Sequence, residues 1–227
     1  NRIKNLNNSL NTLINLYILD LSKNQIESIS ETDFNGLINL IELNLSNNII
    51  KFFKYPNDNV ILPKLKKLFL SNVSIEFIIK LNLSSLGYLE EIDLSDNNLS
   101  YLYFSNNLKN LKKFNLKNSL IQLKKNYSFW SFIENLNFIK EIELFNSNRI
   151  LFNSQNFNSK NDMIFLESLT LSKLNLQNYE DLHLNPNNKI KRLDLSLNLL
   201  KFIKKNYFSK SNSLKFLNLS FNMIFHV

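Results

Sequence analysis

Leucines recur along this chain at a regular spacing, and no other feature of the sequence restricts the fold so strongly. The pattern is L-x-x-L-x-L-x-x-N-x-L-x-x-L, with isoleucine at some leucine positions, and nine copies align over the 227 residues. Positions are numbered from the residue that opens each copy. The copies open at Leu16, Leu40, Leu65, Leu89, Leu111, Ile139, Leu166, Ile190 and Leu214, at intervals of 22 to 28 residues. Such self-similarity indicates one structural unit per copy, packed against its neighbours.

The L-x-L segment at positions four to six has period two, which predicts a short strand whose leucines share one face. Consecutive strands must run parallel because the chain completes a full coil between them, and about a dozen residues remain for that return. One coil alone cannot bury its apolar face, so stacked coils join their leucines into one core. Residues 1–227 are therefore expected to form a single open solenoid whose strands line one face.

The composition fits a repeat and excludes several chemistries. Leu (44 residues) and Asn (42 residues) make up more than a third of the chain, and with 44% hydrophobic residues the core is well supplied. Without Cys there is no thiol nucleophile, zinc-thiolate site or disulfide. His183 and His226 are far apart, and the isolated Gly36 and Gly87 cannot form a phosphate-binding loop. We expect no enzyme, no cofactor and no metal site.

Asparagine occupies position nine in five copies, at Asn24, Asn48, Asn97, Asn198 and Asn222. Where the chain turns away from its strand, backbone groups lose their partners, and a carboxamide can both donate to them and accept from them. These asparagines are therefore predicted to be structural. Ser119 and Ser147 can replace them in part. Val73 and Leu174 cannot, so weaker or altered loops are predicted there.

Positions two, three, five, seven and eight are predicted to project from the strand surface. At positions two and three the charges alternate in sign from copy to copy, as in Lys66, Glu90 and Lys112. Adjacent strands lie about 4.8 Å apart, so opposite charges should face each other along the sheet. The net charge is +8, but a polyanion would require positive rows on successive strands. Nucleic acid is therefore disfavoured as a partner of this face.

A carboxylate cluster, Glu90, Glu91, Asp93 and Asp96, is the one group that could suggest acid–base catalysis. Nothing in the pattern implies a cleft that would desolvate one carboxyl and raise its pKa. We do not expect catalysis there, and weak coordination of Ca²⁺ is the alternative.

Three copies show the pattern most clearly, and these resemble the leucine-rich repeat family: Leu16-Tyr-Ile-Leu-Asp-Leu-Ser-Lys-Asn24, Leu89-Glu-Glu-Ile-Asp-Leu-Ser-Asp-Asn97 and Ile190-Lys-Arg-Leu-Asp-Leu-Ser-Leu-Asn198. An aromatic residue six positions before the next copy, at Phe34 and Phe208, is similar to the typical class of about 24 residues found in Toll-like receptor and related animal ectodomains. The resemblance implies an α/β leucine-rich repeat solenoid. It would be a curved, right-handed coil with a parallel sheet on the concave face and irregular or short helical segments on the convex side.

The resemblance also implies a function, which is binding of another protein or peptide. The expected context is a cell-surface or secreted receptor or adhesion ectodomain, with dimerisation on ligand binding and no membrane contact within this segment. Residues 1–15 look like the tail of a preceding repeat, so the chain is expected to be an internal piece of a longer ectodomain. The alternative is a cytoplasmic scaffold, or a regulator of a catalytic domain outside the segment.

Candidate partner-binding residues are apolar side chains on outward-facing positions, namely Phe69, Phe145, Phe216 and Phe221. Trp130 is a further candidate, with packing against a neighbouring coil as the alternative. N-glycosylation sequons begin at Asn7, Asn44, Asn72, Asn82, Asn98, Asn126 and Asn218. With so much Asn and Ser several are expected by chance, and Asn44 and Asn218 lie within predicted strands, where a glycan would cover the concave face.

Overall fold

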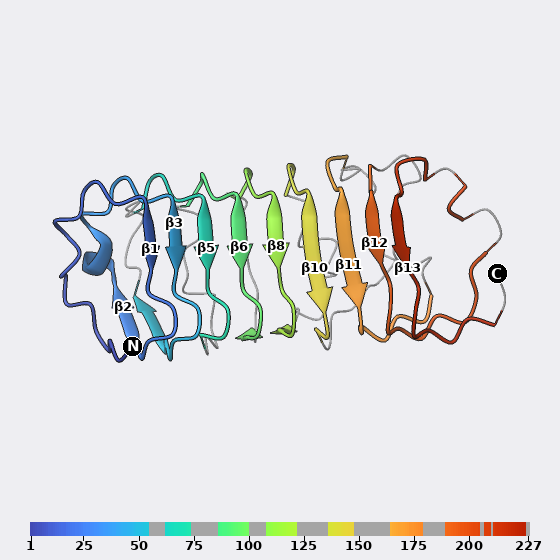
Figure 1. Ribbon diagram of the computed structural model, residues 1–227, viewed down its shortest axis with the longest axis horizontal. Coiled ribbons are helices and arrows are strands. Elements are labelled where there is room, and N and C mark those ends of the chain that lie inside the picture. Colours follow the sequence, from blue (N-terminus) through green and yellow to red (C-terminus); the bar gives the residue numbers. More distant parts are fainter. Residues whose placement is uncertain are drawn as a thin grey trace.

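Nine strands form one parallel sheet along the length of the molecule (Figure 1). The computed structural model describes residues 1–54, 62–73, 86–99, 108–121, 136–147, 164–178, 189–204, 207–209 and 211–225. The strands are β1 (Ile18–Asp20), β3 (Glu42–Asn44), β5 (Lys67–Phe69), β6 (Glu91–Asp93), β8 (Lys113–Asn115), β10 (Glu141–Phe145), β11 (Ser168–Ser172), β12 (Arg192–Asp194) and β13 (Phe216–Asn218). They follow chain order across the sheet. The prediction of one parallel strand per copy is confirmed.

The register of the sheet is the register of the repeat. Each position-four residue pairs with position four of the next copy, as Leu19 does with Leu43 and Leu193 with Leu217. Positions one, four and six point inward, and in the second copy Leu40, Leu43 and Leu45 are fully buried. The core is therefore one continuous column of Leu, Ile and Phe side chains that no single coil could bury alone.

Outside the large sheet, regular structure in the described residues is sparse. Two small parallel sheets pair β2 (Ser28–Ser30) with β4 (Phe52–Lys54) and β7 (Asn98–Leu99) with β9 (Leu120–Ile121). The one helical element among the described residues is a 3₁₀ turn, η1 (Glu31–Phe34). The helical half of the predicted α/β class is thus missing from this part of the chain, which is a β-solenoid. Curvature, hand and a helical convex side stay predictions.

The aromatic marker of the repeat packs into the core. Phe34 closes η1 and is fully buried, as is Leu37 three residues later. Gly36 lies between them, and a side chain there would overlap the backbone of Asn11 in the preceding coil. Within the described residues, no helix is long and apolar enough to cross a bilayer.

Candidate partner-binding face

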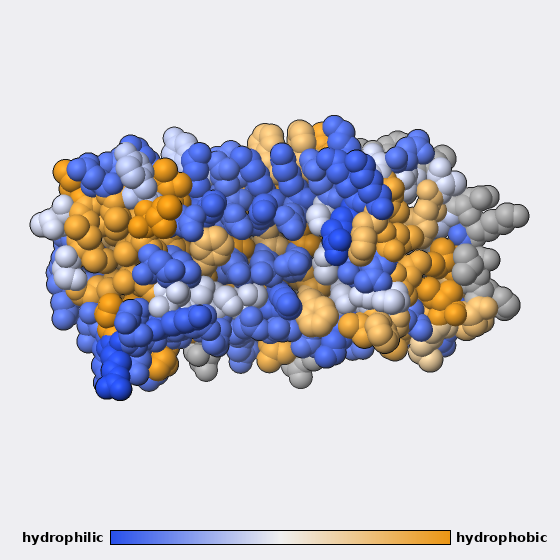
Figure 2. All heavy atoms as spheres, in the orientation of Figure 1, coloured by the Kyte–Doolittle hydropathy of each residue, from blue (hydrophilic) through white to orange (hydrophobic). Residues whose placement is uncertain are grey.

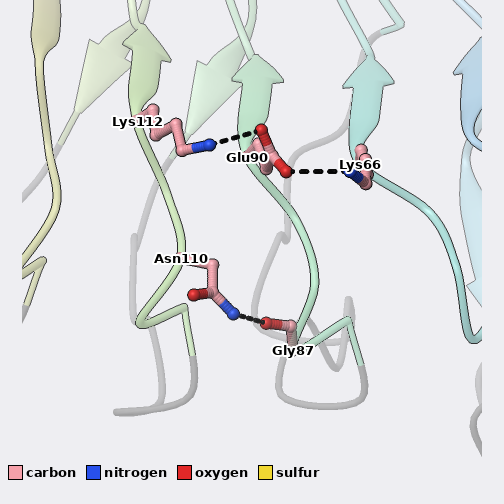
Figure 3. A network of polar contacts seen from close by, with 5 residues as sticks. All are labelled: Lys66, Gly87, Glu90, Asn110 and Lys112. Carbon is pink, nitrogen blue, oxygen red and sulfur yellow. Dashed lines mark hydrogen bonds and ion pairs between the residues drawn. The ribbon is translucent and has the colours of Figure 1, made fainter.

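The outward side chains at positions two, three and five form the surface called here the sheet face. At its centre Glu90 lies between two lysines, with its carboxylate 3.2 Å from Lys66 Nζ and 2.7 Å from Lys112 Nζ (Figure 3). These contacts, the Lys112 hydrogen bond first, hold the pKa of the Glu90 carboxyl below its usual value. The predicted alternation of charge across neighbouring strands is therefore confirmed at this rung.

Three further ion pairs continue the alternation on the sheet face. Their Nζ–Oε2 distances are 3.1 Å for Lys67–Glu42, 3.5 Å for Lys113–Glu141 and 2.7 Å for Lys191–Glu167. The lysine side chains are exposed, so the pairs favour the correct strand order more than they stabilise the fold.

A shallow hollow of about 110 Å³ lies over β6, β8 and β10. It is lined by Glu91, Ile92, Asp93, Lys113, Phe114, Asn115, Glu141 and Glu143. Its volume is well below the several hundred Å³ of a small-molecule pocket, so it could admit the head group of one side chain but not a whole metabolite. Among the described residues no three carboxylate or imidazole groups come together as a metal site.

The predicted carboxylate cluster is divided by the fold. Glu90 is paired with its two lysines, whereas Asp96 lies in the turn after β6, where it accepts a hydrogen bond from Asn118 at 2.8 Å. Only Glu91 and Asp93 line the hollow, where Glu141 and Glu143 from β10 join them. Sequence reasoning missed this pairing because the two glutamates come from a coil two copies later.

Position five has a structural role that the sequence analysis did not assign. Asp or Asn occupies it in six copies, and in each the side-chain oxygen accepts the backbone N–H two residues on, at 2.8–3.1 Å. The six residues are Asp20, Asn44, Asp93, Asn115, Asp194 and Asn218. Hydrogen bonds from Ser22 hold the pKa of the Asp20 carboxyl below its usual value. These side chains close the turn at the strand end, as Asx residues commonly do.

Position seven was predicted to face outward, and this is wrong for four of the nine copies. Ser46, Ser95, Ser172 and Ser196 are buried there. The chain turns at this point, which directs the hydroxyl between coils, where Ser172 and Ser196 hydrogen bond at 3.0 Å. In the two copies that carry larger residues, the Lys117 ammonium lies 5.5 Å from the Phe145 ring centroid.

Position eight adopts a left-handed backbone conformation in all nine copies, with φ between 51° and 58°. The residues are Lys23, Asn47, Asn72, Asp96, Asn118, Asn146, Lys173, Leu197 and Phe221. Asn and Asp tolerate this conformation best among residues with a side chain. Their side chains also bond from coil to coil, from Asn72 to Asn47 at 3.0 Å and from Asn146 to Asn118 at 3.3 Å. We call the Asn and Asp residues of this row, Asn47, Asn72, Asp96, Asn118 and Asn146, the amide ladder.

The position-nine asparagines bond the backbone of their own coil and of the preceding one. The Asn97 amide donates to the carbonyls of Leu94 and Ser95 at 2.9 and 3.0 Å, and to that of Leu70 at 2.7 Å. Its oxygen accepts the N–H of Val73 at 3.0 Å. Asn48, Asn198 and Asn222 repeat this set of bonds, and Asn24 bonds its own coil and the N–H of Ile3.

The exceptions at position nine use other contacts. The hydroxyls of Ser119 and Ser147 donate to the preceding coil, to Leu94 O at 2.8 Å and Leu116 O at 2.7 Å. Val73 is buried in the core, and the Leu174 N–H donates to Asn198. The asparagine of the following copy thus supports both apolar exceptions, and the predicted change in their loops stays a prediction.

The four candidate phenylalanines occupy four different positions of the repeat. Phe69 and Phe145 are half-buried at positions five and seven, whereas Phe216 and Phe221 are exposed at positions three and eight. The Phe216 ring lies 3.8 Å from the guanidinium of Arg192. The structure therefore does not gather the four into one patch, and Trp130 lies outside the described residues.

Two exposed apolar residues of the sheet face were missed, Tyr17 and Ile18 at positions two and three of the first copy. Their signal was visible, because both positions are charged in most other copies.

The sequon asparagines are placed differently. Asn7, Asn72 and Asn98 are exposed, whereas Asn44 and Asn218 are half-buried within β3 and β13. Asn82 and Asn126 lie outside the described residues.

No protein-family model matches this sequence, and no curated protein sequence matches it. Solved structures do match. An internalin from Listeria monocytogenes superposes with a TM-score of 0.70 and 20% identity, covering 99% of this chain and 66% of that one. The Drosophila Toll–Spatzle complex gives 0.70 and 20%, covering 99% and 32%. The complex of TLR13 with ssRNA13 gives 0.67 and 22%, covering 97% and 35%.

These identities establish a common fold only, and the chain spans no more than two thirds of the length of each matched structure. All three are leucine-rich repeat proteins. The spacing of the copies, the in-register parallel strands and the asparagines at position nine point to the same architecture. The chain therefore has the leucine-rich repeat fold.

Proposed function

We propose that this chain is the protein-binding part of a cell-surface or secreted receptor or adhesion protein, and that it is a segment of a longer ectodomain. The observation that carries the proposal is the sheet face, a continuous surface of outward side chains from nine neighbouring strands, whose hollow over β6, β8 and β10 is only about 110 Å³. Such a surface suits a macromolecular partner, because a stable protein interface takes about 800 Å² from each side.

The matched complexes support a binding role without naming the partner. The Toll structure is a complex with Spatzle, and the TLR13 structure is a complex with an RNA. On the present chain Glu90 lies between Lys66 and Lys112, and Glu91 lies in register between Lys67 and Lys113. That alternation favours a protein partner over a nucleic acid, which would need an uninterrupted positive row.

Panning a displayed library of random peptides against the native chain tests this proposal. We expect binders whose affinity falls at least about tenfold when a rung of the sheet face is reversed by Glu90→Lys. The matched control is Lys51→Glu, a charge reversal at an exposed residue of the return segment. Equal effects of the two substitutions, or binding of RNA alone, would refute the proposal.

The cytoplasmic scaffold is the second candidate, and the absence of cysteine from the chain fits it equally well. Mass-spectrometric peptide mapping of the native polypeptide separates the two. Asn72 and Asn98 are exposed and accessible to a glycosyltransferase. Glycans at these residues would support the secretory route, and unmodified asparagines in the native protein would support the cytoplasmic one.

A further inference from the structure

The positive charge of the chain is concentrated in its last two coils. Residues 189–227 contain eight Lys and Arg against one Asp, a net charge of +7, whereas residues 1–188 contain 19 against 18. In the described part of these coils, the single carboxylate, Asp194, already accepts hydrogen bonds from Ser196 and Asn218. Lys201 and Lys215 are exposed and have no ion-pair partner among the described residues. Lys201 and Lys215 therefore leave uncompensated positive charge at this end of the molecule, although Lys191 pairs with Glu167 of the preceding copy at 2.7 Å.

The same two coils carry an exposed apolar group, called here the C-terminal patch. It consists of Leu197, Leu199, Phe221 and Met223, which are 41%, 37%, 79% and 57% exposed. They fill positions eight and ten of the last two copies, and the N–H of Leu197 bonds Ser220 O in the next coil at 2.9 Å. Figure 2 shows hydrophobic atoms gathered at this end, and also at the N-terminal end, with a hydrophilic middle between them.

For Leu197 and Leu199 the end of the stack does not explain this exposure. Positions eight and ten face solvent in other coils too, where they hold polar pairs such as Lys23 with Gln25 and Asp96 with Asn98. Leu197 and Leu199 belong to the eighth copy, which the ninth copy covers, and they are still exposed. The coil geometry therefore directs these side chains into water, and only in the last two copies are both positions apolar among the described pairs.

Backbone conformation makes Leu197 and Phe221 unfavourable for folding as well. Their φ values are 56° and 55°, where a residue with a Cβ is strained unless its side chain is short and polar. Five other copies avoid the strain with Asn or Asp at the same position. A bulky residue that is both strained and exposed stabilises nothing in the fold, which points to a role in binding.

We propose that the C-terminal patch and the cations around it dock an acidic protein segment that carries apolar anchor residues. Lys173 lies beside Leu197 at position eight of the preceding copy, and Lys201 follows the patch along the chain. Anionic side chains of the partner would pair with these cations, while its apolar anchor residues would contact the four side chains of the patch, of which Phe and Met are types enriched at interfaces. This inference rests on the proposed function and specifies its partner.

Single-stranded RNA and an anionic lipid surface share the negative charge but fit the patch less well. Bases stack on aromatic rings, and three of the four patch side chains are aliphatic. Peripheral lipid binding commonly uses the apolar face of an amphipathic helix, and the patch lies on turns.

The test titrates the native chain with a synthetic peptide that alternates glutamate with leucine or phenylalanine. Two comparison peptides carry serine for the apolar residues or lysine for the glutamates. We expect binding of the first peptide only, at least about tenfold weaker for Phe221→Asn and for Leu197→Asn. Because Asn relieves the strain, both variants should keep or raise Tm, by about 2–4 °C. Ile49→Asn, an exposed apolar position ten in the second copy, is the matched control and should bind normally.

Several results would overturn the inference. The first is failure of the glutamate-containing apolar peptide to bind at about 1 mM, and the second is binding that Phe221→Asn leaves unchanged. The third is a lower Tm for Phe221→Asn, which would mean that the Phe221 side chain packs in the fold. Binding of poly(U) or phosphatidylserine vesicles with the same dependence on Phe221 would replace the partner class. If library peptides bind the sheet face but ignore Phe221, the proposed function survives and this inference fails. If no peptide binds anywhere, both fail.

Discussion

The central coils and the last two coils share one backbone and use it differently. At position eight Asn72 and Phe221 have nearly the same φ, 51° and 55°. In the centre the residue is Asn or Asp and contributes to the amide ladder, whereas at the C-terminal end it is Leu or Phe and points into water. The coil sets the backbone conformation at position eight but does not fix which residue occupies it. A residue that suits this conformation poorly therefore points to a role in binding and not in folding.

Charge shows the same division. In the centre Glu90 joins Lys66 and Lys112, and each charge has a neighbour of opposite sign. In residues 189–227 one Asp stands against eight cations. The centre is balanced internally. At the end Lys191 pairs with Glu167, whereas the exposed Lys201 and Lys215 have no ion-pair partner among the described residues.

The largest expected difference between the regions concerns position nine. Asn97→Ala removes three donated bonds and one accepted bond in a buried site, so we expect a loss of about 3 kcal/mol in the free energy of unfolding. Asn222→Ala, at a half-buried site in the last coil, should cost about 1 kcal/mol because water replaces part of the bonding. Urea unfolding measures both, and equal losses would show that burial does not distinguish the two coils.

Placing an apolar residue in the amide ladder tests whether such a residue is strained by the positive φ of position eight. Asn118→Leu should cost about 1–2 kcal/mol, because Leu is strained at φ 55° and the bonds to Asp96 and Asn146 are lost. Asn118→Gly separates the two terms, since Gly accepts this φ freely but makes no side-chain bond. A Leu variant as stable as the Gly variant would mean that strain is unimportant and would remove one support of the C-terminal patch.

The contribution of the Glu90 ion pairs to the free energy of unfolding depends on pH. Folding lowers the Glu90 pKa below its ordinary value of 4.5, so the contribution is complete above that pH and is lost as pH falls through the folded-state pKa. We expect Glu90→Gln to cost about 0.5–1 kcal/mol at pH 7 and nothing in strong acid. Glu91→Gln, which has no ion-pair partner among the described residues, is the control. A pH-independent difference between wild type and Glu90→Gln would exclude the ion-pair explanation.

The smallest expected effect on the free energy of unfolding is at Arg192, which stacks on Phe216 near the C-terminal end. Arg192→Lys keeps the charge but loses the planar contact with the Phe216 ring, 3.8 Å away, and should cost about 0.5 kcal/mol. Chemical denaturation of the two proteins side by side measures it. A cost above about 2 kcal/mol would mean that Arg192 is part of the fold and not of the cationic surface.

Much of the fold could be predicted from the sequence because one spacing rule applies to every coil. Leu40, Leu43 and Leu45 are buried where the pattern placed them, and the alternation at Glu90 follows from register alone. The candidate site was less predictable. Position seven turns inward in four copies, and the hollow joins Glu91 with Glu143 from two coils away, because local backbone direction decides both.

The sequence by itself determined the repeat, the strand order, the core and the sign of charge on each rung, since all of these depend on spacing along one chain. The tertiary structure decided which positions face water and which adopt positive φ. It also showed that Leu197 and Phe221 are poorly suited to their position, because an exposed site favours a polar side chain and a positive φ favours Asn, Asp or Gly. The physical reason is that conformational strain and solvent exposure belong to a coil in place against its neighbours, and a list of residues does not contain them.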